Sequence, residues 1–127
     1  MKHEEGFLNE NSDRMIYYQC WLPEDNLKAV LLVVHGLAEH CGRYMNLVNR
    51  FVPLGYGVYT FDLPGHGKSY GKRVFINRFE DYIQTLAVFR DKVRTMPIRL
   101  TPKTAERRSR HSCQTPGCSH APSYSPA

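Results

Sequence analysis

The chain has 127 residues, of which 42% are hydrophobic, and this length limits it to one small domain. Residues 1–96 carry 12 Lys and Arg against 11 Asp and Glu, whereas residues 97–127 carry five against one. The basic character is therefore a property of the C-terminal segment, which argues against a nucleic-acid-binding surface on a folded domain.

The sequence predicts neither a leader peptide nor a membrane span. The first ten residues, MKHEEGFLNE, lack the apolar core of a signal peptide. The longest apolar run, residues 29–34, is much shorter than a bilayer requires. Cysteines at 20, 41, 113 and 118 form no framework typical of small secreted domains. We expect a cytoplasmic protein, with peripheral membrane association as the alternative.

The N-terminal half of the chain predicts two strands. No element is assigned to residues 1–12. Residues 13–22, DRMIYYQCWL, are rich in aromatic and β-branched types, which favours a strand. Residues 28–34, KAVLLVV, form an almost unbroken apolar run, which is typical of a central strand buried on both faces.

The next elements alternate between helix and strand. Residues 43–54 place apolar side chains at helical spacing, which predicts a helix that Pro53 and Gly55 stop. A short strand is expected at 56–61 and a longer amphipathic helix at 79–94. The pattern predicts an α/β fold with about three to four strands and two helices.

The composition changes after residue 96. Residues 97–127 hold five of the eight prolines and show no apolar period. Such a segment buries too little surface to offset the entropy of ordering it, so we expect a disordered tail. The predicted organisation is an N-terminal segment over 1–12, a partial domain over 13–96 and the tail over 97–127.

Two motifs, HGLAEHCGRY at 35–44 and FDLPGHGKS at 61–69, stand at the ends of predicted strands. With these motifs the chain resembles the N-terminal part of the monoglyceride lipase and lysophospholipase group of α/β-hydrolases, which have serine aminopeptidase S33-type domains. The resemblance covers about residues 13–95. It implies hydrolysis of monoacylglycerols, lysophospholipids or related esters by a Ser-Asp-His triad without a cofactor.

The resemblance also implies residue roles. The loop of His35, Gly36 and Leu37 would form part of the oxyanion hole, with Leu37 as the backbone N–H donor. The residues expected to brace this loop or to shape the second motif are Glu39, His40, Arg43, Asp62, Gly65, His66 and Gly67.

Ser69 lies in the only G-x-S-x-G match, GKSYG at 67–71. A nucleophile elbow needs its serine directly between a strand and a helix. Here the predicted strand ends at Phe61 and the next helix begins near Phe79, so we interpret Ser69 as a loop residue. A phosphate-binding loop is excluded because Asp62 stands where its first glycine is required.

No triad is recognisable downstream. Residues 97–127 contain no further G-x-S-x-G and no Asp, and their only histidines are His111 and His120. We therefore expect a chain that stops before the nucleophile, through truncation, a shifted frame or an alternative last exon, and that is inactive. The missing strand would leave an apolar sheet edge open, so poor solubility, self-association or partner binding through that edge are the alternatives.

The tail offers one further hypothesis. His111, Cys113, Cys118 and His120 place four ligand types within ten residues. Zinc or nucleic-acid binding by the tail is thus a third function, but the cysteine spacing is loose and no apolar residues support a fold around a metal. We expect no metal and no cofactor.

Overall fold

The computed structural model describes residues 1–96, and the predicted tail lies outside them. These residues form the strands β1 (Lys2–Asn11), β2 (Arg14–Leu22), β3 (Ala29–Val34) and β4 (Tyr56–Phe61). The helices are α1 (Met45–Phe51) and α2 (Phe79–Thr95), and short 3₁₀ turns, η1 (Cys41–Tyr44) and η2 (Val52–Leu54), flank α1. The predicted α/β fold is confirmed.

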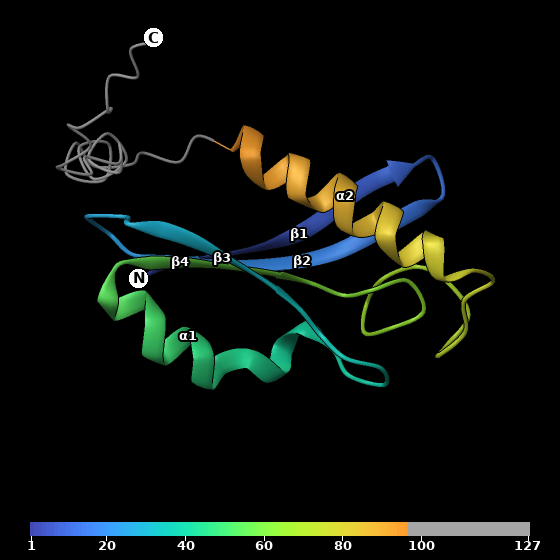
Figure 1. Ribbon diagram of the computed structural model, residues 1–127, viewed down its shortest axis with the longest axis horizontal. Helices are drawn as coiled ribbons and strands as arrows, with labels where there is room; N and C mark the ends of the chain where they lie inside the picture. Colours follow the sequence, from blue (N-terminus) through green and yellow to red (C-terminus); the bar gives the residue numbers. More distant parts are fainter. Residues whose placement is uncertain (97–127) are drawn as a thin grey trace, which may run out of the picture.

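The strands form one mixed sheet in the order β1-β2-β4-β3. β1 and β2 form an antiparallel hairpin, β2 and β4 are antiparallel, and β3 and β4 are parallel. A parallel pair needs a crossover, which α1 and its flanking turns supply. The two helices therefore cover opposite faces of the sheet (Figure 1).

Each face of the sheet has its own hydrophobic core. Alternate residues of β4 point to opposite faces, so Val58 packs toward α1 whereas Tyr59 and Phe61 pack toward α2. The rings of Phe61 and Phe89, a buried residue of α2, have centroids 4.4 Å apart. Burying an aromatic or aliphatic side chain of this kind contributes roughly 1.5–3 kcal/mol, so these contacts fix α2 on the sheet.

The helix bounds follow from local chemistry. The helix predicted over 43–54 is divided into η1, α1 and η2, and it ends where Gly55 adopts φ +91° and donates its N–H to the Val52 carbonyl. This left-handed conformation suits glycine, which ends helices in this way. No helix within residues 1–96 is both long enough and apolar enough to span a bilayer.

β4, rather than β3, is the fully buried strand. β4 lies between β2 and β3, and five of its six residues are buried. Every residue of β3 is half-buried or exposed, and within residues 1–96 β3 pairs only with β4. The prediction that 28–34 is buried on both faces is therefore wrong for the described part of the chain, where an apolar, uncharged edge is open.

β1 was not anticipated. It pairs with β2 over most of its length, in a register that sets Phe7 opposite Tyr17, and Ser12 and Asp13 form the turn between the strands. Its residues are largely exposed and polar, so hydrophobic periodicity gave little signal. Pairing with β2 determines this strand, and the His3 ring stacks on Trp21 at a centroid distance of 4.9 Å.

Candidate functional site

Two loops meet where the parallel strands β3 and β4 end. The 35–44 loop follows β3 and contains the first motif, and the 62–71 loop follows β4 and contains the second. Sites in α/β folds commonly lie beyond the carboxyl ends of parallel strands, because loops from neighbouring strands converge there. The structure thus brings the two motifs together.

Two buried histidines join these loops reciprocally. His35, in the first loop, accepts the Leu63 N–H at Nε2 at 2.9 Å. His66, in the second loop, accepts the Ala38 N–H at Nε2 at 3.3 Å. With Nε2 as the acceptor, each Nδ1 carries the proton and donates it to a carbonyl, Gly36 O at 2.8 Å for His35 and Pro64 O at 3.0 Å for His66.

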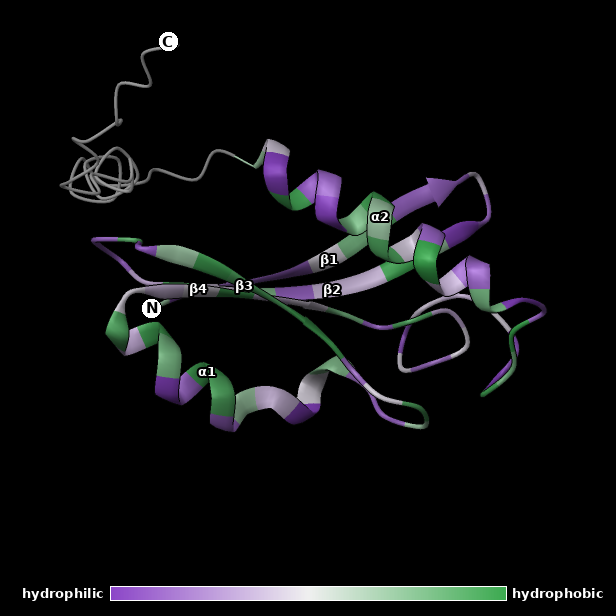
Figure 2. Ribbon diagram, in the orientation of Figure 1, coloured by the Kyte–Doolittle hydropathy of each residue, from purple (hydrophilic) through white to green (hydrophobic). Residues whose placement is uncertain are grey.

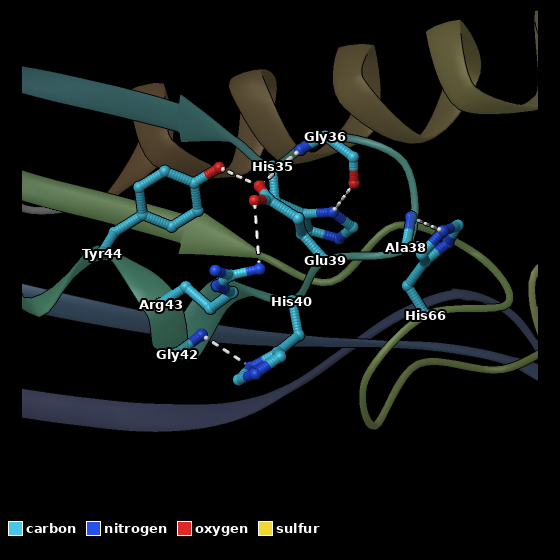
Figure 3. Close-up of polar contacts among 9 residues, drawn as sticks. All are labelled: His35, Gly36, Ala38, Glu39, His40, Gly42, Arg43, Tyr44 and His66. Carbon is cyan, nitrogen blue, oxygen red and sulfur yellow. Dashed lines mark hydrogen bonds and ion pairs between the residues drawn. The ribbon is translucent and has the colours of Figure 1, made fainter.

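The two rings lie 5.1 Å apart between centroids and are both buried. Both nitrogens of each ring form hydrogen bonds with the loop backbones. Figure 3 shows the contacts of His35 with Gly36 and of His66 with Ala38. Burial lowers the pKa of His35, and the neighbouring His66 lowers it further, whereas the Gly36 carbonyl opposes the shift. His35 is therefore held as a neutral ring that fixes loop geometry.

Asp62 makes the third connection between the loops. One carboxylate oxygen accepts the Cys41 N–H at 2.7 Å and the other accepts the Lys68 N–H at 2.9 Å. Asp62 is 2% exposed, so these charge-assisted bonds replace its hydration. Burial, with the nearby Asp62 charge, raises the pKa of the Cys41 thiol and leaves it unreactive.

Gly67 is required by the same carboxylate. Its φ of +47° is left-handed, and a Cβ there would lie 1.9 Å from Asp62 Oδ2. Gly65 is also left-handed, with φ +76°. The glycines of the second motif therefore allow the backbone to fold tightly around Asp62.

Ser69 is buried at 2% exposure in the same loop. Its hydroxyl donates to the Asp62 carbonyl at 2.6 Å and accepts the Tyr17 N–H at 2.9 Å. β4 ends at Phe61 and α2 begins only at Phe79, so no strand–turn–helix elbow surrounds it. Within residues 1–96, neither Ser12 nor Ser69 forms a hydrogen bond with a histidine.

Glu39 braces the first loop from within. Its carboxylate accepts the Gly36 N–H at 3.2 Å and the Tyr44 hydroxyl at 3.0 Å, and it pairs with Arg43 at 3.3 Å (Figure 3). The Tyr44 hydrogen bond, followed by that from Gly36, lowers the pKa of Glu39. His40 lies apart and caps η1 by accepting the Gly42 N–H at 3.2 Å.

Leu37 has a distinctive backbone N–H. The N–H groups of Gly36 and Ala38 bind Glu39 and His66, and the Glu39 N–H donates to the Gly36 carbonyl at 3.3 Å. Within the described part of the chain, the Leu37 N–H donates no hydrogen bond, and its side chain is 76% exposed. The loop therefore holds one donor available for a ligand.

A pocket of about 450 Å³ opens at this loop, and Leu37 is one of the residues that line it. One wall comes from β3 and the two motif loops, and the other from the first half of α2. The lining is apolar except for two imidazoles and one phenol: Val34, His35, Leu37, Leu63, His66, Phe79, Tyr82, Ile83 and Leu86. An apolar pocket with few polar groups suits an acyl chain.

The α2 lining residues were not predicted as site residues. The 3–4 spacing of apolar residues in this helix predicts that its whole apolar stripe packs on the sheet. In the structure Phe89 and Val93 are buried in the core, whereas Phe79 and Ile83 remain 68% and 53% exposed at the pocket. The 3–4 spacing indicated the stripe, but not the point at which it passes from the core to the pocket.

No group of three His, Cys, Asp or Glu side chains within residues 1–96 could hold a metal ion. The tail cluster of His111, Cys113, Cys118 and His120 lies outside the described residues. The site described above is therefore built from backbone donors, imidazoles and apolar walls.

Comparison with known proteins gives consistent matches. A family model described as "Serine aminopeptidase, S33" matches residues 25–103. The monoacylglycerol lipase of Mycolicibacterium smegmatis is 35% identical over 83 residues, covering 65% of this chain and 29% of that protein. Phospholipase YtpA of Bacillus subtilis is 36% identical over 74 residues, covering 58% and 29%.

The crystal structure of Paleococcus ferrophilus monoacylglycerol lipase is also similar. It is 35% identical, with a TM-score of 0.51, and the match covers 61% of this chain and 29% of that one. The chain thus spans less than a third of the length of each of these three relatives.

Proposed function

Because the chain belongs to the serine aminopeptidase S33 family of α/β-hydrolases, we propose that it forms the carbonyl-binding side of a site for monoacylglycerols or lysophospholipids. The observation that carries this proposal is the unused Leu37 N–H beside an apolar pocket of about 450 Å³. An acyl chain seated against α2 would bring its ester carbonyl to the 35–44 loop. Relatives named as a monoacylglycerol lipase and a phospholipase support this substrate class.

The chemical role of the loop follows from charge development. Attack on an ester carbonyl places negative charge on its oxygen, and a fixed backbone N–H stabilises that charge without reorganising. Loss of one such donor typically costs about 10²–10³ in kcat in acyl-transfer enzymes. Here His66 and Glu39 hold the flanking N–H groups, so the Leu37 donor is preorganised.

We further propose that the described residues do not supply the nucleophile. Ser69 uses its hydroxyl as both donor and acceptor in the buried loop. Both carboxylate oxygens of Asp62 accept hydrogen bonds from backbone N–H groups. Both ring nitrogens of His35 and of His66 form hydrogen bonds with backbone groups. Residues 1–96 would therefore bind an ester without cleaving it.

The first test is labelling of the full chain by a serine-reactive fluorophosphonate probe, with Ser69→Ala as the matched variant. We expect no labelling at Ser69, because its oxygen is buried and has no base beside it. Labelling of the folded chain that disappears in Ser69→Ala would show that the G-x-S-x-G match is catalytic and would overturn this part of the proposal.

The second test measures binding by ¹H–¹⁵N NMR as decanoylglycerol or a decanoyl lysophospholipid is added. The Leu37 amide should shift most, because it is the expected hydrogen-bond donor to the carbonyl. Ile83→Asp, within the pocket, should abolish the shift, whereas Leu54→Asp, at an equally exposed apolar position in η2, should preserve it. Shifts that avoid Leu37 and survive Ile83→Asp would contradict the proposed site.

A second candidate function rests on the open edge of β3, which we propose as a self-association surface. The outer edge strand β1 is rich in charged residues, KHEEGFLNEN, and charge discourages pairing between edges. β3 reads AVLLVV and has no charge. Sedimentation velocity should show dimers that Val34→Lys disrupts and Leu54→Lys does not. A monomer with a single cooperative melting transition would exclude this role.

A further inference from the structure

The segment that joins the 62–71 loop to α2 combines exposed apolar and cationic side chains. Val74, Phe75 and Phe79 are 58%, 50% and 68% exposed. The cations between and beside them are also exposed, and no acidic residue occurs between Gly67 and Phe79. We name this surface the basic–apolar rim: Lys72, Arg73, Val74, Phe75, Arg78 and Phe79.

The backbone of the rim is fixed. The Val74 N–H donates to the Gly65 carbonyl at 2.9 Å, and the Phe75 N–H donates to the Lys72 carbonyl at 3.1 Å. The Arg73 guanidinium also donates to the Gly67 carbonyl. Val74 has φ +54°, which is unfavourable for a β-branched residue and persists only where neighbouring bonds impose it. The fold thus holds apolar side chains in water although this conformation costs free energy.

The rim borders the pocket. Phe79 belongs to both, and Leu37, which is 76% exposed, lines the same pocket from the 35–44 loop. These loops lie together beyond the ends of β3 and β4 (Figure 1), and Figure 2 shows hydrophobic stretches within both. A surface that contacts the rim would therefore also face the pocket mouth.

The positive charges of the rim are not neutralised by ion pairs within the described residues. Among the ion pairs formed within residues 1–96, none involves Lys72, Arg73 or Arg78. Lys72 Nζ lies 5.3 Å from the centre of the Phe75 ring, so one cation sits directly beside an exposed aromatic side chain. The next acids along the chain, Glu80 and Asp81, belong to the first turn of α2, where the helix dipole favours negative charge.

We propose that the basic–apolar rim is a contact surface for an anionic lipid bilayer. Apolar side chains at a bilayer surface insert at the boundary between headgroups and acyl chains, and neighbouring cations are attracted to anionic headgroups. An anionic bilayer fits this surface because the rim combines positive charge and exposed aromatic rings and contains no acidic residue. Binding of the rim would turn the pocket mouth toward the lipid, and it requires no ester hydrolysis.

The test is flotation of the full chain with phosphatidylcholine vesicles, prepared with and without phosphatidylserine. We expect binding that depends on phosphatidylserine and that weakens as salt rises, because counterions screen exposed charges. Equal binding to both vesicle types, or no binding to either, would overturn the proposal.

Two rim variants and two matched controls locate the contact. The first is a triple variant that removes the charge: Lys72→Gln, Arg73→Gln and Arg78→Gln. The second is a double variant that removes the apolar contact: Val74→Ser and Phe75→Ser. Each should reduce partitioning about tenfold or more, since a juxtamembrane cation and an inserted apolar side chain both contribute strongly to binding. The charge control, Arg50→Gln with Lys92→Gln and Arg94→Gln, removes equal charge elsewhere. The apolar control, Leu54→Ser, removes one exposed apolar side chain elsewhere.

The controls should bind as the unchanged chain does. All variants keep residues 97–127, so binding that depends on the basic tail would survive in the rim variants and would contradict the proposal. Fluorescence of Trp21, the single tryptophan, which is 3% exposed, reports whether each variant is folded.

Discussion

The Ser69 hydroxyl donates to the main-chain carbonyl of Asp62 at 2.6 Å, and it also accepts the Tyr17 N–H at 2.9 Å. One side chain thereby joins β2 to the loop that follows β4. The serine of the G-x-S-x-G match thus connects two backbone segments in the protein interior. We therefore assign Ser69 a role in the folding of this loop.

Replacing Ser69 by Ala should destabilise the fold. The change leaves a buried Tyr17 N–H without an acceptor, and an unsatisfied buried group costs about 1–3 kcal/mol. Urea unfolding followed by Trp21 fluorescence measures the free energy of unfolding. Ser12→Ala, in the exposed hairpin turn, is the matched control and should change it little. Equal effects of the two changes would contradict the structural role of Ser69.

Replacing Gly67 by Ala should be more damaging than replacing Gly36. A Cβ at Gly67 would lie 1.9 Å from Asp62 Oδ2 on a left-handed backbone, whereas one at Gly36 would lie 3.5 Å from Glu39, an ordinary contact. Displacing Asp62 would also weaken its bond to the Cys41 N–H. We expect a loss of roughly 1–3 kcal/mol or more for Gly67→Ala, because strained backbone and lost hydrogen bonds combine. Thermal melting of both variants measures this difference, and Gly67→Ala should have the lower melting temperature.

Acid should destabilise the junction of the two loops through His35. Burial lowers the pKa of His35 in the folded chain, so the unfolded chain binds a proton more readily. The free energy of unfolding should therefore be constant above the unfolded pKa of about 6.5 and should fall as the pH drops below it. Protonation would also remove the acceptor for the Leu63 N–H.

The check on this pH dependence is His35→Gln. The Gln side-chain carbonyl can still accept a hydrogen bond but does not titrate. The free energy of unfolding should therefore fall less below about pH 6.5 in this variant. His40→Gln changes an exposed ring and should retain the full loss. An unchanged acid dependence in His35→Gln would exclude His35 as its source.

Cys41 should resist alkylation in the folded chain. Burial raises the pKa of its thiol, and the adjacent Asp62 raises it further, so little thiolate forms near neutral pH. Iodoacetamide followed by peptide mapping should modify Cys41 only after unfolding in urea. Asp62→Ala, which removes the acceptor of the Cys41 N–H, should expose the thiol at low urea. Rapid modification of the native chain would show that the loop opens readily.

Local patterns in the sequence were sufficient for most of the fold. Strands over 14–22, 29–34 and 56–61 and helices over 45–51 and 79–95 lie close to their predicted positions, because hydrophobic spacing and terminating Pro or Gly residues act within a few residues. β1 was missed because its polar residues carry no apolar period and its pairing partner is β2. The motifs at 35–44 and 61–69 also indicate the family from the sequence alone.

By itself, then, the sequence determined the order of the elements after β1, the family and the position of the two motif loops. Only the tertiary structure decided that β4 is the buried strand, that α2 lines a pocket, and that Leu37 holds an unused N–H. The physical reason is that hydrogen bonds such as His66 to Ala38 and Asp62 to Cys41 join residues more than twenty positions apart. Which donors and side chains remain free depends on such contacts, and no local pattern records them.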